Sequence, residues 1–372
     1  MHSWKLYTLL VTLWLSTGVR PLLADSDSAE WTFSPADFWG FRSAPLVHDG
    51  RVYIGSLNKT FYCLDAETGA VVWQRPLGGR VTWSTPAREG KVIAVGCEDG
   101  KVYAFSTAAE KPEESIWTTA VGARVDGSPA AGGGRFYVGS MDKKVYALSA
   151  SDGKVAWTFN AEDEVFGQPL LSDGKVYFGA GGFDGKTVYC LDAAKGGKLF
   201  STEVGTPVYS SLLRSGDHIV FGTQGGKLMA LDSKDGAPAW SLEVKGAVFG
   251  SAVLAGNTII FGSQESKIHG VDARSHKGTW EFSTTLEFPT GEAGVDNKKN
   301  EKRYYPTLCR PTVRGGDVVF ALAYGIFCLD GTTGKQKWRK RLANPVDAPS
   351  VTLDDNHVYV ATRLSLQKWR ID

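Results

Sequence analysis

The 372-residue sequence predicts an all-β fold, an eight-bladed β-propeller, on three observations. A segment that ends in tryptophan recurs along the chain, mostly at intervals of 40 to 44 residues. The composition, with 44 glycines and 12% aromatic residues, suits many short strands joined by tight turns. The two ends of the chain each hold one part of a repeat that is otherwise incomplete.

The repeat is recognised by a turn followed by a tryptophan strand. Six copies align without a gap: FYCLDAETGAVVW (61–73), VYALSASDGKVAW (145–157), VYCLDAAKGGKLF (188–200), LMALDSKDGAPAW (228–240), IHGVDARSHKGTW (268–280) and IFCLDGTTGKQKW (326–338). A seventh copy, residues 102–117, has three extra residues in its turn. The final column holds Trp73, Trp117, Trp157, Phe200, Trp240, Trp280 and Trp338, with one longer step of 58 residues. This period is typical of radially arranged or stacked supersecondary units.

Each unit is expected to contain four strands. The first follows a Ser/Pro-rich start such as STPA or GSPA, the second resembles KVYFG, and the third and fourth flank the turn of the repeat. That turn often has Asp or Ser at its head and Gly four residues later. Asp accepts hydrogen bonds from nearby backbone amides, and Gly adopts a positive φ without a steric penalty.

The cysteines are expected to be packing residues. Period-two alternation places Tyr62 on one face of its strand and Cys63 on the other. The column of Cys63 holds small side chains in the other repeats: Ala104, Ala147, Cys190, Ala230, Gly270 and Cys328. An odd total of five cysteines also argues against a complete disulfide framework.

The chain ends predict how the ring closes. The terminal Trp369-Arg370-Ile371-Asp372 aligns with Tyr62-Cys63-Leu64-Asp65 and stops at the head of the turn, which puts Arg370 in the small-residue column. Residues 28–34, with Trp31 as the docking residue, then supply the missing fourth strand. Closure removes the two sheet edges that an open array would expose. An open solenoid is the alternative, but it leaves the half-unit at each end unexplained.

The N-terminus indicates export. Lys5 followed by the apolar run 6–19 and by Ala24 is typical of a secretory signal, so residues 1–24 are predicted to be a signal peptide and 25–372 one propeller domain. The run is too short for a comfortable membrane span. Without residues 1–24 the chain has 39 basic and 40 acidic residues, a charge of −1. This balance disfavours nucleic-acid binding, and we expect a soluble, monomeric protein of the periplasm or extracellular space, with the outer-membrane periphery as one option.

The pattern V-Y-x-L-D followed by A-x-[DS]-G-x-x-x-W resembles the tryptophan-docking repeat of pyrroloquinoline quinone (PQQ) propellers over nearly all of residues 28–372. The resemblance implies one of two branches. Quinoprotein dehydrogenases of this family hold PQQ and calcium in the channel, whereas the BamB-like branch is non-catalytic and acts as a lipoprotein scaffold in outer-membrane β-barrel assembly.

The sequence departs from both branches. Dehydrogenases of the family are longer, and several have a disulfide between adjacent cysteines, whereas no two cysteines are adjacent here. We find no transferable catalytic Asp or calcium ligands, the histidines lack ligand spacing, and the lipid-acceptor Cys of the BamB-like branch is missing. We therefore expect no catalytic residue, no cofactor and no metal, with PQQ and calcium only under the dehydrogenase alternative.

The predicted binding face carries the connections between blades. These share a register: RVTWS (80–84), RVDGS (124–128), EVFGQ (164–168), PVYSS (207–211), AVFGS (247–251) and PVDAP (345–349). Their third positions, expected to ring the channel mouth, are Thr82, Asp126, Phe166, Tyr209, Phe249 and Asp347. Trp39, Phe41 and Trp83 are expected nearby, with Arg80 and Arg124 flanking them. Such aromatics suit docking of a partner's exposed strand or loop. The alternative is that they plug the junctions between blades.

An insertion over residues 285–310 accounts for the long step and should lie on the same face. Long loops in compact folds are often functional, so its Tyr304 and Tyr305 are assigned to partner binding; the alternative is a solvated flap. The sequence thus favours an exported, non-catalytic scaffold that binds a protein partner in the cell envelope. A quinone-dependent dehydrogenase or its inactive descendant, and a carbohydrate-binding propeller, remain the alternatives.

Overall fold

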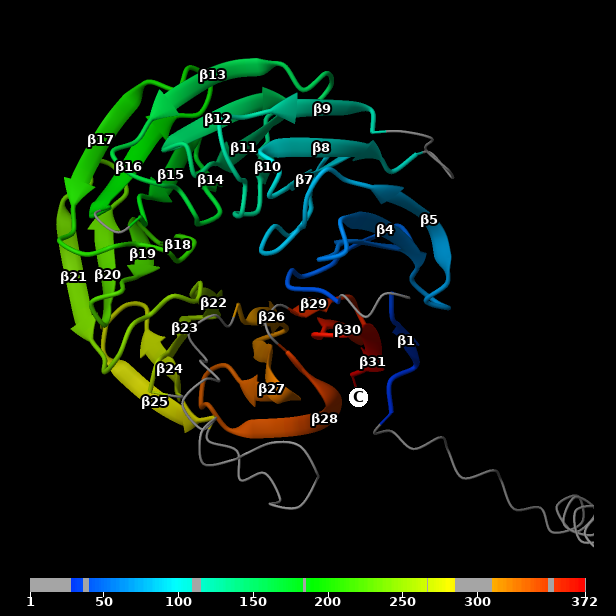
Figure 1. The fold of residues 1–372 in the computed structure, drawn as a ribbon. Helices are drawn as coiled ribbons and strands as arrows, with labels where there is room; N and C mark the ends of the chain where they lie inside the picture. The colour runs from blue at the N-terminus through cyan, green and yellow to red at the C-terminus, as the bar shows by residue number, and fades with distance from the viewer. Residues whose placement is uncertain are drawn as a thin grey trace, which may run out of the picture.

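The computed structural model describes residues 28–35, 40–108, 115–182, 185–265, 267–284, 310–346 and 351–371. The predicted signal peptide and nearly all of the 285–310 insertion lie outside these ranges. The described residues form eight antiparallel sheets arranged around a central axis, as the view along that axis shows (Figure 1). The prediction of an eight-bladed propeller is confirmed.

The blades are numbered in chain order. Blades 1 to 3 contain β2 (Leu46–His48), β3 (Arg51–Gly55), β4 (Thr60–Asp65) and β5 (Val71–Pro76); β6 (Ala87–Glu89), β7 (Val92–Gly96), β8 (Lys101–Ser106) and β9 (Trp117–Ala120); and β10 (Ala130–Gly132), β11 (Arg135–Gly139), β12 (Lys144–Ser149) and β13 (Val155–Asn160). Blades 4 to 6 contain β14 (Leu170–Ser172), β15 (Lys175–Gly179), β16 (Thr187–Asp192) and β17 (Lys198–Glu203); β18 (Leu213–Ser215), β19 (His218–Gly222), β20 (Lys227–Asp232) and β21 (Pro238–Glu243); and β22 (Val253–Ala255), β23 (Thr258–Ser263), β24 (Lys267–Asp272) and β25 (Gly278–Ser283).

Blade 7 contains β26 (Thr312–Arg314), β27 (Asp317–Asp330) and β28 (Gln336–Val346), and β27 spans the stretch that forms the second and third strands elsewhere. Blade 8 contains β29 (Val351–Leu353), β30 (His357–Ala361), β31 (Leu366–Arg370) and β1 (Trp31–Phe33). In each blade the first strand lies innermost and the tryptophan strand outermost (Figure 1).

The N-terminal strand completes the last blade, as predicted. Strand β1 pairs antiparallel with β31, with Trp31 opposite Lys368. The predicted register of β31 is wrong by two residues, however. Tyr359 pairs with Lys368, as Tyr53 pairs with Cys63 in blade 1. Lys368, and not Arg370, therefore occupies the small-residue column.

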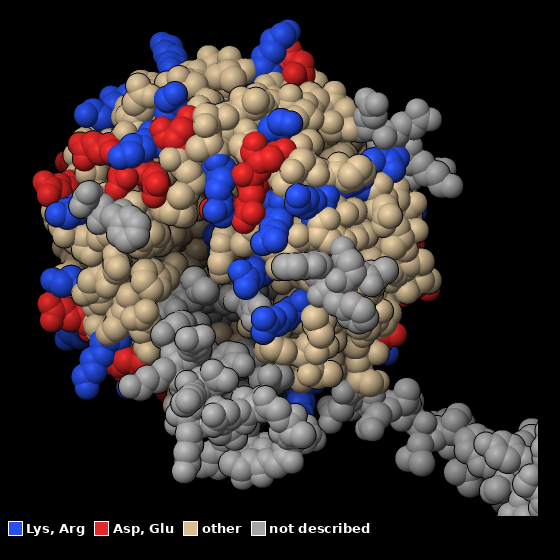
Figure 2. All heavy atoms as spheres, in the orientation of Figure 1, with Lys and Arg blue, Asp and Glu red and all other residues tan. Residues whose placement is uncertain are grey.

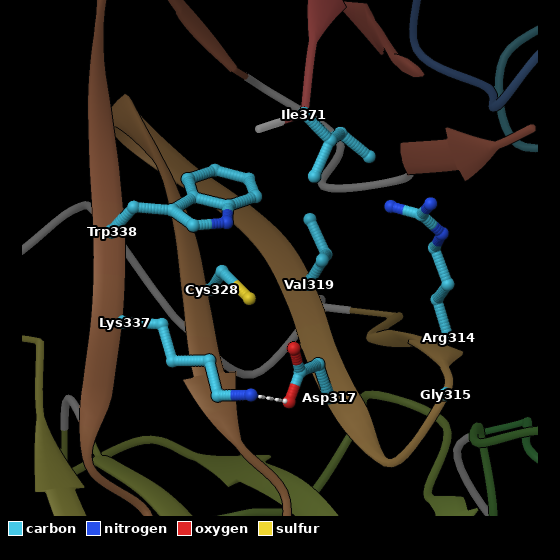
Figure 3. A pocket seen from close by; sticks show the side chains of 8 residues that line it. All are labelled: Arg314, Gly315, Asp317, Val319, Cys328, Lys337, Trp338 and Ile371. Carbon is cyan, nitrogen blue, oxygen red and sulfur yellow. Dashed lines mark ion pairs between the residues drawn. The ribbon is translucent and has the colours of Figure 1, made fainter. Parts of the chain in front are cut away.

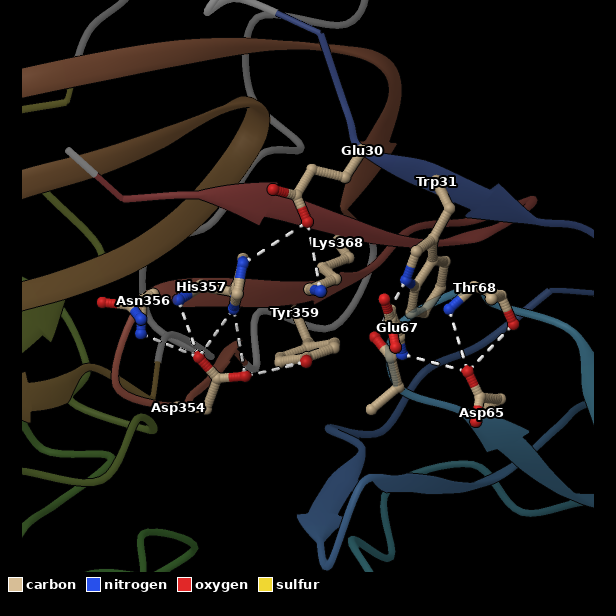
Figure 4. A network of polar contacts seen from close by, with 11 residues as sticks. Glu30, Trp31, Asp65, Glu67, Thr68, Asp354, Asn356, His357, Tyr359 and Lys368 are labelled. Atoms are coloured by element: carbon tan, nitrogen blue, oxygen red, sulfur yellow. Dashed lines mark hydrogen bonds and ion pairs between the residues drawn. The ribbon is translucent and has the colours of Figure 1, made fainter.

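This column accommodates Lys368 because the lysine ammonium group pairs with a carboxylate. The Lys368 side chain is 8% exposed, and its Nζ lies 3.1 Å from Oε2 of Glu30, the residue just before β1. His357 Nε2 lies 3.4 Å from the same carboxylate, and His357 Nδ1 contacts Asp354 at 2.9 Å (Figure 4). A polar network thus joins the two chain ends of blade 8.

The outermost tryptophans dock on the following blade. Four indole Nε1 groups donate to a backbone carbonyl in its turn: Trp31 to Ala66 (3.1 Å), Trp117 to Ala150 (2.9 Å), Trp157 to Ala193 (3.0 Å) and Trp280 to Gly331 (3.2 Å). The turn's glycine lies flat against the ring. A Cβ on Gly69, whose φ is +73°, would lie only 2.7 Å from Trp31 Cδ2, so no other residue fits there without displacement.

The other docking positions vary in chemistry. Phe200 has no donor, but Gly236 packs on its ring in the same way. Trp240 stacks on His276, which stands in the place of the turn glycine with a φ of +59°, at a centroid distance of 4.7 Å. Trp73 packs against Phe61 and Phe105. The eighth position, Trp338, faces a pocket.

The described cysteines are buried free thiols: Cys63, Cys97, Cys190 and Cys328. Burial raises the pKa of Cys63 to about 12 and that of Cys190 to about 11. Thiols with such pKa values stay protonated near neutral pH and are poor nucleophiles. The burial of Cys63, Cys190 and Cys328 supports the packing role that was predicted for their column.

Candidate functional site

Five connections between blades are each fixed by two backbone hydrogen bonds. In the first, Glu98 N of blade 2 donates to Arg80 O (2.9 Å), and Val81 N donates back to Ser56 O of blade 1 (3.1 Å). The same pair of bonds recurs at 2.9–3.4 Å in the connections that begin at Arg124, Glu164, Pro207 and Ala247. The shared register predicted from the sequence therefore gives the third positions of these five connections equivalent, well-anchored places.

Valine plugs the junctions at the second position of these connections. The five valines are at most 1% exposed: Val81, Val125, Val165, Val208 and Val248. Each packs against the terminal glycine of the second strand in the preceding blade; a Cβ on Gly55, for example, would meet Val81 Cγ1 at 2.5 Å. Because consecutive residues of an extended segment point in opposite directions, the third positions are turned away from this packing.

Three of the predicted residues form a continuous aromatic row. The ring centroids of Phe166 and Tyr209 are 5.5 Å apart, as are those of Tyr209 and Phe249, and the ring planes are inclined at 56° and 71°. Aromatic pairs favour such tilted and edge-to-face arrangements. All three side chains are half-buried. Burial raises the pKa of Tyr209, and the nearby carboxylates of Asp163 and Glu164 add to the effect.

On blades 1 to 3 the predicted ring is polar instead. Thr82 Oγ1 donates to Glu98 Oε1 at 2.5 Å, and Arg124 Nη2 bridges Glu98 (3.0 Å) and Asp126 (3.1 Å). Asp126 is 6% exposed, so burial raises its pKa, although Arg124 counteracts part of the shift. Thr82, Glu98, Arg124 and Asp126 form a cluster whose polar side chains contact one another. Two carboxyl groups share one guanidinium group, so the cluster is largely engaged within itself.

The remaining predicted residues are distributed differently. Trp83 is half-buried beside Thr82. Phe41 was expected near the channel mouth, but it is fully buried against Phe33 and Tyr62. Its N–H donates to Thr362 O, so it takes the plug position of the closing junction, where a larger apolar side chain replaces valine. Trp39, Tyr304, Tyr305 and Asp347 lie outside the described residues.

One residue near the axis was not predicted from the sequence. Arg310, which precedes β26 in blade 7, donates from Nη1 to Ser128 Oγ of blade 3 at 3.4 Å, across the ring. Burial lowers the pKa of its guanidinium group. Ser128 Oγ also accepts from Thr85 N (2.9 Å), and Ser211 N donates to Ser251 Oγ (3.2 Å), so hydroxyls link neighbouring connections. No local pattern marks Arg310, because its partner lies 182 residues away in sequence.

The described residues contain no cluster of carboxylates of the kind that calcium sites usually have. Calcium requires six to eight oxygen ligands, usually including several carboxylates. Within the described ranges, no group of three or more His, Cys, Asp or Glu residues could hold a metal ion.

The face seen in Figure 2 intersperses acidic and basic side chains around a central hollow. In the same described part of the chain, no helix is long and apolar enough to cross a membrane.

The repeat and the closed eight-bladed ring are those of a PQQ-like propeller of the BamB type. Residues 42–315 match the family described as the beta-propeller of the beta-alanine-activating enzyme, and the chain belongs to this family.

Relatives with known names differ in role. An outer membrane protein assembly factor BamB from Burkholderia pseudomallei is 25% identical over 184 residues, 48% of this chain and 46% of that protein. The serine/threonine-protein kinase AfsK of Streptomyces griseus is 30% identical over 181 residues, 44% of this chain but only 21% of the kinase. The chain thus spans less than half the length of either relative.

The crystal structure of BamB from Moraxella catarrhalis superimposes with a TM-score of 0.73 at 13% identity, and the match covers 92% of this chain and 99% of that one. At this identity the likeness shows the fold alone.

Proposed function

We propose that this protein is a non-catalytic interaction propeller that binds an exposed strand or loop of a protein partner over the aromatic row. The single observation that carries the proposal is the row itself. Phe166, Tyr209 and Phe249 lie on three successive connections, half-exposed and in contact, while valines close the junctions beneath them. Aromatic side chains that are held rigidly but are not needed to fill the junctions are typical anchors of protein interfaces.

The surroundings of the row favour a partner segment with some positive charge. Asp163 lies beside the row and is paired with Lys143 at 3.3 Å, while Glu164 contributes a second carboxylate near Tyr209. A partner's lysine or arginine would meet Glu164 while its apolar side chains cover the rings, whereas Asp163 is buried and already paired. Electrostatic matching of this kind mainly sets specificity and association rate.

The setting proposed is the cell envelope. The predicted signal peptide of residues 1–24 indicates export, and several relatives are named outer membrane protein assembly factors. The proposed partner is therefore an envelope protein, and the protein itself acts as a scaffold at the periphery of the outer membrane. The residues assigned to contact are those of the row and Trp83, together with Tyr304, Tyr305 and Asp347, which are assigned from the sequence and lie outside the described residues.

The test is site-specific photo-crosslinking in the native host with the reactive group at position 249, followed by mass spectrometry. We expect one envelope protein to be captured there and not at position 199, an exposed leucine of the outer strand β17. Capture should fall by about thirtyfold in a Phe166→Ala/Tyr209→Ala variant, since each interface anchor contributes about 1–2 kcal/mol or more. Equal capture at 249 and 199, or none at 249 from a correctly exported ring, would contradict the proposal.

A further inference from the structure

The residues that precede the innermost strands are linked from blade to blade by hydrogen bonds. Each lies two residues before the first strand of blades 1 to 7: Ala44, Thr85, Ser128, Gln168, Ser211, Ser251 and Arg310. Four of these links run from a backbone N–H to a side-chain oxygen in the next blade: Ala44 to Thr85 (3.3 Å), Thr85 to Ser128 (2.9 Å), Gln168 to Ser211 (3.3 Å) and Ser211 to Ser251 (3.2 Å). We name these seven residues the axial ring.

Arg310 is the charged member of the axial ring. Its Nη1 donates to Ser128 Oγ at 3.4 Å. Blades 3 and 7 lie opposite each other in the ring of eight, so the Arg310 side chain reaches across the central axis (Figure 1). Its guanidinium group therefore lies near the centre of the propeller.

The charge of Arg310 has no counter-charge among the described residues. Ser128 Oγ is the partner that this part of the chain gives its guanidinium group, and no described carboxylate lies within ion-pair distance. Asp126, two residues before Ser128, is engaged by Arg124. Arginine stays protonated in proteins, and a buried cation is unfavourable unless an anion accompanies it. Burial indeed lowers the pKa of Arg310, yet the residue is only half-buried, so small solutes can reach it.

The series of links is interrupted beside Arg310. By the pattern of the other blades, Ser251 N would donate to the side chain of residue 310. A guanidinium group cannot accept a hydrogen bond, and Ser251 N has no partner among the described residues. A backbone N–H is thus left without an acceptor next to the positive charge.

Two hydroxyl groups add donors at the axis. Ser128 Oγ accepts from Thr85 N, and Ser251 Oγ accepts from Ser211 N. Within the described ranges neither hydroxyl donates a hydrogen bond, whereas Ser210 Oγ donates to Gly222 O at 3.1 Å. The axis therefore gathers one cation, one N–H and two hydroxyl protons that the described chain does not pair. Such an excess of donors over acceptors suits an anion.

We propose that the axis of the ring binds a small oxyanion, a free phosphate or carboxylate, between Arg310 and Ser251. The guanidinium fork would donate two parallel hydrogen bonds to two oxygens of the ion, an arrangement that arginine favours with both groups. Ser251 N and the hydroxyls of Ser251 and Ser128 would donate to the same ion. This site is separate from the aromatic row and stands whether or not the row binds a partner.

The test is isothermal titration calorimetry of the full chain with sodium phosphate at pH 7, with the ionic strength held constant by sodium chloride. We expect saturable binding of a single phosphate. Arg310→Gln should weaken binding by more than about tenfold, which is 1.4 kcal/mol, because charge-assisted hydrogen bonds are lost. Arg310→Lys keeps the charge without the fork and should weaken binding by about fivefold. A second titration with sodium acetate distinguishes the two sources: saturation with acetate alone would assign the site to carboxylates.

Arg88→Gln is the matched control, because Arg88 lies on the first strand of blade 2 and its Nη1 donates to Gly90 O at 2.6 Å. This variant should bind phosphate like the wild type. Ser251→Ala removes one hydroxyl and should weaken binding by about threefold. It also serves if Arg310→Gln does not fold. Absence of saturation with both phosphate and acetate, or equal binding by Arg310→Gln, would overturn the proposal.

Urea unfolding distinguishes a ligand site from a structural tie across the ring. Phosphate should raise the unfolding midpoint of the wild type and leave that of Arg310→Gln unchanged, since only a bound ligand stabilises the folded state. In chloride alone, Arg310→Gln should unfold at the wild-type midpoint or above it, because the variant no longer carries the unpaired charge. A lower midpoint together with unchanged phosphate binding would make Arg310 a tie between blades 3 and 7 and would contradict the proposal.

Discussion

Blade 8 borders two junctions that use the same residue type and differ in outcome. On one side its own Trp31 docks on blade 1, where Ala66 O accepts from the indole and Gly69 covers the ring. On the other side Trp338 of blade 7 faces a pocket that Ile371 of blade 8 also lines (Figure 3). Among the described residues, one junction of blade 8 is thus closely packed and the other contains a pocket.

The largest effect is expected when the filled junction is emptied. Trp31→Ala removes a large side chain that is 9% exposed together with its hydrogen bond, and should lower the free energy of unfolding by about 3–5 kcal/mol. Trp338→Ala should lower it by less than half as much, since one side of its ring faces the pocket. Urea denaturation of both variants checks this. Equal losses would mean that the two junctions contribute equally to the free energy of unfolding, which would contradict the comparison.

Gly69 tests the same contact from the other blade. Gly69→Val places a branched side chain at a φ of +73° and against the ring of Trp31, so we expect a loss of about 2–3 kcal/mol in the free energy of unfolding. Gly197→Val is the control, because a Cβ there meets nothing within 4 Å. Thermal unfolding should separate the two variants clearly; a neutral Gly69→Val would show that the turn can move away from the indole.

The ion pair across the chain ends should come next in size. Glu30→Gln leaves the buried Lys368 ammonium without its carboxylate. Breaking a fully buried pair costs about 3–5 kcal/mol, but Glu30 is 36% exposed and water screens the loss, so about 1–2 kcal/mol is expected. Glu243→Gln, which removes the carboxylate of the exposed Lys227–Glu243 pair, should change stability by less than about 0.5 kcal/mol.

Blade 8 should also be sensitive to acid through Asp354. Burial favours a higher pKa for this carboxyl, but hydrogen bonds from Asn356 N, Tyr359 Oη and His357 outweigh it and lower the pKa (Figure 4). A lowered folded-state pKa contributes stability that is present above the unfolded value near 3.9 and is lost as the pH falls through the folded value. Asp354→Asn should therefore reduce stability at pH 7 by about 1 kcal/mol and flatten its decline below pH 4. Urea denaturation at pH 3 and pH 7 gives the free energy of unfolding at each pH. If the difference between the two values is the same in Asp354→Asn as in the wild type, Asp354 does not have this role.

The sequence allowed most of the ring to be predicted, because a tryptophan column and a glycine turn recur wherever blades dock. The register predicted for β31 was wrong because Trp369 resembles the aromatic residue of the repeat. Lys368, which occupies the small-residue column, does not have a small side chain. The aromatic row followed from the register of the connections, whereas the plugging role of Val81 and its equivalents was visible in the same alignment and overlooked. The contact of Arg310 with Ser128 and the pocket at Trp338 depend on side chains brought together only by ring closure, for which local patterns give no signal.

The smallest effect sharpens the comparison most. Trp157→Phe keeps the packing at a filled junction but loses the donor to Ala193 O, so the free energy of unfolding should fall by about 1 kcal/mol. Trp338→Phe has no such bond to lose among the described residues, and its cost should stay below about 0.5 kcal/mol. Urea denaturation of the two variants measures this difference. Equal losses would mean that the indole hydrogen bond adds nothing at the filled junction.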